Sequence, residues 1–117
     1  MNNTTFNLFN AVIGTPDTTD KSDIIRAIES LSDNDFRVFG YRVGLDIGSR
    51  PMSLSQVSVA TGLSRQRCDQ IENHAIGRLR KHFAESGVHL AECMDIRVTK
   101  KLIQVVNKQN GERIIIE

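Results

Sequence analysis

Hydrophobic positions follow helical spacing up to about residue 87 and change to a β-rich pattern from Asp95 onward. Apolar residues three or four positions apart share one face of a helix, so each such run predicts an amphipathic helix. Strand-forming residues on both sides of Asn110 and Gly111 predict a β-hairpin, because this pair favours a tight turn with positive φ at both positions. We therefore expect a mainly α protein, a helix-turn-helix bundle of four or five helices with a C-terminal β-hairpin.

Three segments follow from this pattern. Residues 1–20 are polar around a Gly-Thr-Pro-Asp turn. They are expected to be flexible, unless their apolar residues form a short docking turn or strand that packs on the rest of the chain. Residues 21–87 hold the predicted helix-turn-helix domain, and residues 95–117 form the hairpin tail.

Two helices are predicted ahead of the glycine turn. The first, over residues 21–31, begins at an Asp or Ser cap. The second, over residues 34–43, follows a variant capping box formed by Ser32 and Asp35. Residues 46–52 are expected to form a loop. The residues predicted to point inward from the first of these helices are Ile24, Ile25, Ile28 and Leu31.

The clearest local pattern is a pair of helices joined by a glycine turn. Ser53 and Ser64 can each cap a helix, because a hydroxyl at that position accepts a bond from an otherwise unpaired backbone N–H. Gly62 lies between them, where the turn requires positive φ. This layout predicts a helix-turn-helix, which presents the exposed face of its second helix to the DNA major groove. The apolar stripe of that helix is Cys68, Ile71, Ala75, Leu79 and Phe83.

The exposed face near the start of the second helix has residue types that suit base edges. Arg binds guanine with two hydrogen bonds, and Gln and Asn bind adenine in the same way. An ordinary helix pair inside a helical core would show the same caps, but the Arg, Gln and Asn content here favours DNA binding. We predict base contacts from Arg65, Gln66, Asp69, Gln70 and Asn73. We predict phosphate contacts from Ser64, Arg67, Arg78, Arg80 and Lys81, with Arg37 and Arg42 added if their helix crosses the DNA backbone.

The stretch SRQRCDQIENHAIGRLRK, residues 64–81, resembles the recognition helix of region 4 in sigma-70-type initiation factors of bacterial RNA polymerase. The similarity covers about residues 31–83 and depends on the spacing between a Gln-Ile-Glu triplet and a Leu-Arg pair. In that family the region reads the upstream promoter element and docks on the polymerase flap. The resemblance implies double-stranded DNA and RNA polymerase as partners. It implies base contacts from Arg65, Gln66 and Gln70 and phosphate contacts from Arg78 or Arg80.

Three positions depart from the usual pattern of the family. Gln66 stands where Glu is usual, Cys68 where Ile or Val is usual, and Asp69 where a basic residue is common. An acid at position 69 repels phosphate and can accept a hydrogen bond from cytosine, so we expect a different DNA site. At 117 residues the chain also lacks room for the other sigma regions, so we do not expect a complete initiation factor of the usual kind.

The hairpin tail, with strands expected near residues 101–108 and 112–117, lies outside the resemblance. An isolated hairpin is only marginally stable in water. The tail must therefore pack on the helices, add a third strand from residues 96–99, or pair with another copy. Two interpretations remain open: a self-association or partner-binding element, which would make the protein a homodimer, and a β-flap that completes the core of a monomer.

The net charge of +1 conceals an acidic segment followed by a basic one. Residues 1–35 carry more Asp and Glu than Lys and Arg, whereas residues 36–83, which contain the predicted helix-turn-helix, are basic. Phosphate attraction is long-ranged, so such a block favours DNA even in a nearly neutral chain. Solvated charged helices would give the same composition, so charge alone does not decide between a DNA-binding surface and an ordinary solvated surface.

Little in the sequence points to catalysis, a metal or a membrane. His74, His82 and His89 lack an accompanying carboxylate pair, phosphate loop or nucleophile motif, so we expect no enzyme. Cys68 and Cys93 have no Cys or His at zinc spacing, so we expect reduced thiols, no metal and no cofactor. The sequence has no apolar run of membrane-spanning length and no signal-peptide pattern at its start, so we expect a cytoplasmic protein without membrane contact.

These observations favour a sequence-specific DNA-binding regulator of transcription. The alternative is a sigma-like module that binds RNA polymerase or another factor without reading bases itself, an idea to which Asp69 and the acidic N-terminal segment give weight. A mobile-element or phage regulator of replication or transfer would use the same helix at an origin. Binding through several phosphates weakens steeply with salt, whereas binding through apolar burial does not.

Overall fold

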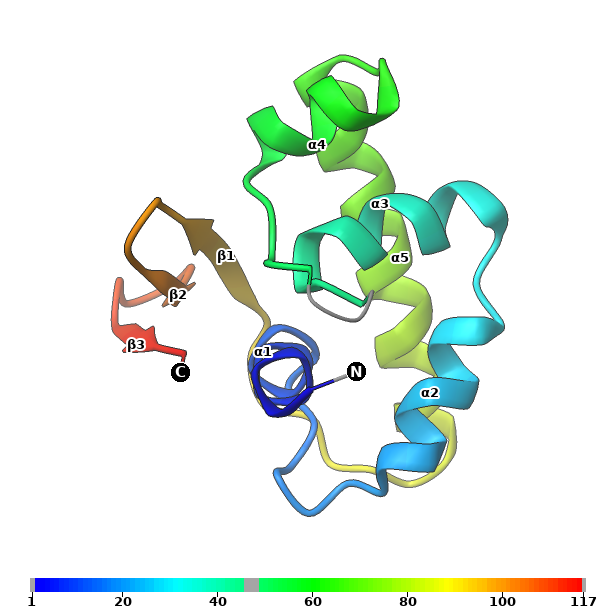
Figure 1. The fold of residues 1–117 in the computed structure, drawn as a ribbon. Helices are drawn as coiled ribbons and strands as arrows, with labels where there is room; N and C mark the ends of the chain where they lie inside the picture. The colour runs from blue at the N-terminus through cyan, green and yellow to red at the C-terminus, as the bar shows by residue number, and fades with distance from the viewer. Residues whose placement is uncertain (1, 46–48, 117) are drawn as a thin grey trace.

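The computed structural model describes residues 2–45 and 49–116 and is mainly helical, with a small antiparallel sheet at its C-terminal end (Figure 1). This confirms the expected helix-rich fold with C-terminal strands. Residues 46–48 of the predicted loop lie outside the described residues. The elements are α1 (Asn3–Ile13), α2 (Lys21–Glu29), α3 (Asp33–Val43), α4 (Leu54–Thr61), α5 (Arg65–Glu85), β1 (Met94–Val98), β2 (Ile103–Asn107) and β3 (Arg113–Ile115).

A helix, α1, stands where the sequence predicted at most a short turn or strand. Asn2 caps this helix, because its side-chain oxygen accepts the N–H of Thr5 at 2.9 Å. The apolar pairs 8–9 and 12–13 recur four positions apart, which is a helical period that the polar residues around them obscured. Their side chains are fully buried, so the segment packs on the rest of the chain. The expectation of a flexible segment excepted this case.

Helices α2 and α3 depart from the predicted patterns in one detail each. Ile25 was predicted to point inward but is 38% exposed. The helix contacts the core only through a narrow stripe that includes Ile24, and the next residue is turned by about 100° around the helix axis. Ser32 caps α3, with its hydroxyl 3.4 Å from the N–H of Asp35. The Asp35 carboxylate does not complete a capping box and lies instead 2.7 Å from Nδ1 of His74 on α5.

The predicted caps and turn between α4 and α5 are confirmed. Ser53 and Gln56 form a capping box, in which each backbone N–H donates to the other residue's side-chain oxygen, at 2.9 and 3.2 Å. Gly62 ends α4 with φ of +75°. Ser64 then caps α5 by accepting the N–H of Arg67 at 3.0 Å. The whole predicted apolar stripe of α5 is buried.

The three strands form one sheet in the order β1-β2-β3. β1 is the third strand, which was one of the three expected ways to stabilise the hairpin. Ile96 and Val105 pair across β1 and β2, and both side chains are buried in the main hydrophobic core. The sheet therefore completes the core of its own chain as a β-flap would, while self-association stays a prediction.

The turn between β2 and β3 is not the predicted two-residue turn. Gly111 has φ of +74°, but Asn110 does not have positive φ. The side chain of Asn107 accepts the N–H groups of Gln109 and Asn110, at 2.8 and 3.2 Å. These hydrogen bonds organise a longer loop, so only the glycine needs the left-handed conformation.

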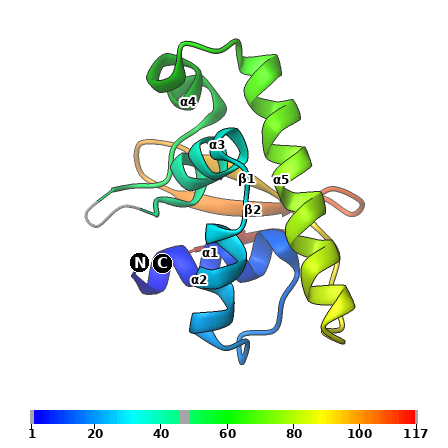
Figure 2. The same ribbon diagram turned by 90° about the vertical axis from the view of Figure 1, so that its right-hand side faces the viewer.

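One main core joins α1, α2, α3, the second half of α5 and the sheet, and a smaller core joins α3 to α4 and the start of α5. Segments 1–20, 21–87 and 95–117, which the sequence pattern separates, thus share the main core. Figure 2 shows α5 running along one side of the molecule, with α4 beside its first turns and α1 and α2 beside its second half. The N-terminal half of α5 is therefore positioned by α3 and α4. The smaller core consists of Val38, Val57, Cys68 and Ile71.

Candidate nucleic-acid interface

The N-terminal half of α5 presents an exposed face of amide side chains. Gln66, Gln70 and Asn73 are spaced by four and three residues, so they project from the same side of the helix. The buried stripe lies on the opposite side and fixes the rotation of α5 against α3 and α4. We call these three residues the amide face; all three are exposed.

Charged side chains flank the amide face on both sides. Arg65 and Asp69 line a groove between α5 and the sheet. Arg67 lies on the other side, where it lines a recess with α3 and its Nη1 donates to Oε1 of Gln70 at 3.5 Å. The structure thus brings the five predicted base-contact residues together on the exposed surface of the first turns of α5, with Ser64 and Arg67 at its edge.

A second helix contributes a cation to this end of the molecule. Arg37 on α3 is exposed, and its Nη2 donates to the backbone oxygen of Ala60 at the end of α4 at 3.3 Å. This hydrogen bond leaves the guanidinium beside the turn that leads into α5. Ser58 strengthens the same turn, because its hydroxyl donates to the backbone oxygen of Leu63 at 2.6 Å.

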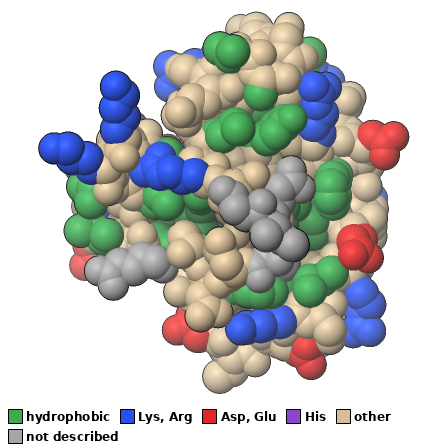
Figure 3. Space-filling model, in the orientation of Figure 1, with side chains coloured by type: hydrophobic (Ala, Val, Ile, Leu, Met, Phe, Trp, Pro, Cys, Tyr) green, Lys and Arg blue, Asp and Glu red, His purple; other side chains and the backbone are tan. Residues whose placement is uncertain are grey.

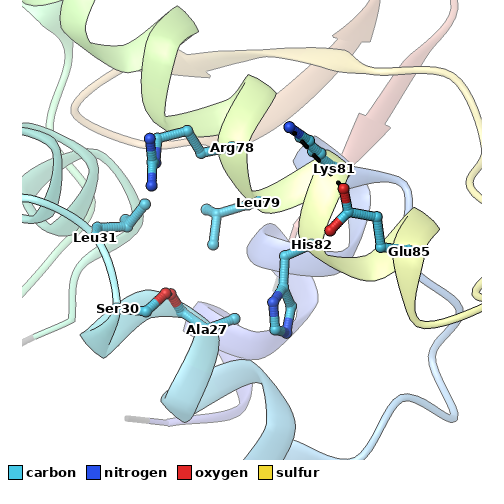
Figure 4. Close-up of a pocket in the computed structure, with 8 residues that line it drawn as sticks. All are labelled: Ala27, Ser30, Leu31, Arg78, Leu79, Lys81, His82 and Glu85. Carbon is cyan, nitrogen blue, oxygen red and sulfur yellow. Dashed lines mark hydrogen bonds and ion pairs between the residues drawn. The ribbon is translucent and has the colours of Figure 1, made fainter.

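The remaining predicted phosphate contacts lie elsewhere. At 1.5 Å of rise per residue, Lys81 stands about 24 Å along the α5 axis from Arg65. Figure 4 shows Arg78 pointing toward Leu31 and Lys81 pointing toward Glu85, around a depression of about 260 Å³ beside α2. Lys81 pairs loosely with Glu85 at 3.9 Å. These two cations therefore do not belong to the cluster around the amide face.

Arg80 has a different environment from the one that the sequence predicted. Its Nη1 donates to the backbone oxygens of Ile13, at 2.6 Å, and Ala91, at 2.8 Å. The side chain is half-buried and connects the end of α1 to the segment that follows α5. Nη1 of Arg80 therefore forms a structural link between two main-chain carbonyls, while a phosphate contact from the same residue stays a prediction.

The assignment of Arg42 is corrected. Its side chain is buried, where Nε contacts Oε2 of Glu72, Nη1 donates to the oxygen of Met52 at 2.8 Å, and Nη2 donates to the oxygen of Ile96 at 3.1 Å. A guanidinium in this position cannot reach a phosphate. Burial raises the pKa of the Glu72 carboxyl, while the Arg42 guanidinium opposes that shift.

Sequence reasoning missed the burial of Glu72 and the position of the sheet. Glu72 is 3% exposed, although it is a charged residue within the basic segment of residues 36–83. Its spacing of four from Cys68 and three from Ala75 places it beside the apolar stripe, which is the pattern that could have revealed it. Nothing in the local sequence indicated that Arg97 and Arg113 would line the groove that Arg65 enters.

Within residues 2–45 and 49–116, no three His, Cys, Asp or Glu side chains form a group that could hold a metal ion. Both cysteines are free, and burial raises the pKa of the Cys93 thiol. None of the helices described has the length and apolar character needed to span a membrane.

One curated relative shares detectable similarity with the chain. Over 69 residues the chain is 30% identical to the protein named RNA polymerase sigma factor sigF, chloroplastic, of Arabidopsis thaliana. The match covers 59% of this chain and 12% of that relative, so the chain spans about an eighth of the relative's length. No family model matches the chain, and no solved structure matches it. The chain thus contains a region similar to part of a sigma factor.

Proposed function

We propose that this protein binds double-stranded DNA sequence-specifically and regulates transcription, with the first half of α5 in the major groove. The observation that carries the proposal is the amide face, three exposed amide side chains on one side of a rigidly capped helix with arginines on both flanks. A helix of this kind, joined to a shorter one by a glycine turn, is the arrangement that helix-turn-helix proteins use to read base edges.

Each side chain in the cluster has a role that follows from its chemistry. Gln66, Gln70 and Asn73 can each bind adenine with two hydrogen bonds, and Arg65 can bind guanine in the same way. Asp69 can accept a hydrogen bond from the amino group of cytosine, which would give this protein a different target from a helix with a cation there. The similarity to a sigma factor supports the assignment to transcription.

The phosphate contacts that we propose are closest to the amide face. Ser64, Arg67 and Arg37 surround the start of α5, where the walls of a major groove about 12 Å wide would stand. Arg78 and Lys81 are exposed farther along the helix and would meet DNA only where a duplex extends or bends beyond the groove that α5 enters.

A second candidate function is docking on RNA polymerase or another transcription factor. The observation that favours it is Val59 on α4, which is 86% exposed, with Phe36 on α3 at 42%. Apolar side chains are not needed on a surface that only contacts phosphate. Their burial against a protein would be largely independent of salt, so this candidate makes a different physical prediction.

The salt dependence of duplex binding tests the two candidates. A mixed-sequence labelled duplex is titrated with wild-type protein and with Arg37→Gln/Arg67→Gln over a range of salt. The proposal expects the logarithm of the binding constant to fall steeply with the logarithm of the salt concentration. For the double variant this slope should be smaller in magnitude by about 1.8, because each phosphate contact contributes about 0.9. Lack of duplex binding, together with salt-insensitive polymerase binding that Val59→Ser weakens, would favour the docking candidate.

A further inference from the structure

The sheet has one apolar face and one charged face, because side chains alternate along each strand. Ile96 and Val105 point into the core toward α1. Arg97 on β1 and Arg113 on β3 lie on the other face, where they line a groove of about 520 Å³ whose opposite wall includes Arg65 of α5. A groove lined by these three arginines therefore lies beside the amide face.

Acidic side chains in this groove only partly balance the arginines. Asp95 lies 3.6 Å from Nη2 of Arg97 and 3.8 Å from Nζ of Lys108, so its charge is shared between two cations. Asp69 is the other carboxylate of the groove wall. The groove therefore keeps an excess of positive charge, which favours a polyanion.

The turn between β1 and β2, residues 99–102, adds two lysines next to Thr99, which lines this groove. The N–H of Thr99 donates to the oxygen of Leu102 at 2.9 Å, and the N–H of Leu102 donates to Oγ1 of Thr99 at 3.0 Å. These bonds close the turn and leave Lys100 and Lys101 exposed at its tip, where neither forms an ion pair with any residue that the structure describes. Figure 3 shows basic side chains projecting at this end of the sheet.

Two arginines fix the sheet and its basic turn relative to α5. Arg42 binds Glu72 of α5 and the backbone oxygen of Ile96 in β1 through one guanidinium. Arg50 donates to the backbone oxygen of Thr99 at the start of the basic turn. The turn is therefore held in a defined place at the groove that Thr99 and Arg65 both line.

We infer that the charged face of the sheet and the basic turn of residues 99–102 form a second contact to DNA. This contact holds the phosphate backbone beside the DNA major groove that α5 enters. This inference rests on the proposed function. A helix seated in the major groove has a phosphate strand on each side. Arg37 and Arg67 face one strand, and the sheet supplies cations for the other, so the C-terminal strands serve as part of the DNA-binding surface.

The test compares two double variants that remove the same charge. Lys100→Gln/Lys101→Gln alters the basic turn, whereas Lys21→Gln/Arg26→Gln alters α2, away from the groove. Binding to a labelled mixed-sequence duplex of about 30 base pairs, roughly three helical turns, is measured across salt for both variants and the wild type. Thermal unfolding shows that each variant folds, as expected for exposed residues.

The basic-turn variant is expected to lower the magnitude of the salt slope by about 1.8, since two phosphate contacts are lost at about 0.9 each. The α2 variant should keep the wild-type slope. Equal slopes for the two variants, with wild-type binding intact, would overturn this inference and leave the proposed function standing. A wild-type protein that binds no duplex would overturn both.

Discussion

Arg42 on α3 and Glu72 on α5 form a buried ion pair, with side chains 3% and 4% exposed. The remaining donors of Arg42 bind carbonyls just before α4 and within β1, so one guanidinium joins four parts of the fold. Arg42→Ala is expected to destabilise the protein by about 3–5 kcal/mol, because it leaves the Glu72 charge buried without a partner. Chemical denaturation of the variant measures this free energy of unfolding.

The double variant Arg42→Met/Glu72→Leu serves as the control for that prediction. Apolar residues of similar volume remove both charges at once, so the double variant should be more stable than Arg42→Ala. A double variant that loses as much stability as the two single variants together would show that the two side chains act independently, which would contradict a coupled buried pair.

Arg80 and Lys81 are neighbours in the sequence but are predicted to respond differently to truncation. Arg80→Ala removes two charge-assisted hydrogen bonds to Ile13 and Ala91 and should destabilise the fold by about 1.5–3 kcal/mol. Lys81→Ala removes an exposed side chain with one loose ion pair and should change stability by less than about 0.5 kcal/mol. Thermal unfolding of both variants checks the contrast, and equal losses would refute it.

Gly14 is predicted to resist substitution. It ends α1 with φ of +88°, and a Cβ there would lie 2.4 Å from the backbone oxygen of Ala91. Gly14→Ala should destabilise the protein by at least about 1–2 kcal/mol from the left-handed conformation alone, with the clash added. Gly62→Ala is a useful comparison, because it shares the positive φ but meets no atom within 4 Å. The larger loss in unfolding free energy should occur at Gly14.

Arg65 is predicted to contribute to sequence preference. Arg65→Ala should weaken binding to the preferred DNA site by about 1–3 kcal/mol and relax one base position, because a guanine contact with two hydrogen bonds is lost. Affinities for the preferred duplex and for a random duplex are compared by titration at one salt concentration. A loss of equal size on both duplexes would indicate that Arg65 contacts only phosphate.

The sequence predicted what depends on local chemistry and missed what depends on distant partners. Ser53, Gly62 and Ser64 each act on backbone within a few residues, so the turn and caps between α4 and α5 could be recognised without the fold. Arg42 and Arg80 look like surface cations in the sequence, and only the packing of α3, α1 and the sheet shows what their guanidiniums contact. The same reason hid the charged groove, because its arginines come from segments far apart in the chain.

Base reading by α5 is tested most sharply by selecting bound sequences from a random duplex pool near physiological salt. Wild-type protein is compared with Arg65→Ala/Gln70→Ala, which alters only exposed side chains. We predict that the wild type enriches one motif and that the variant loses this enrichment while remaining folded. Binding without an enriched motif, or the same motif from both proteins, would contradict base reading by this face of α5.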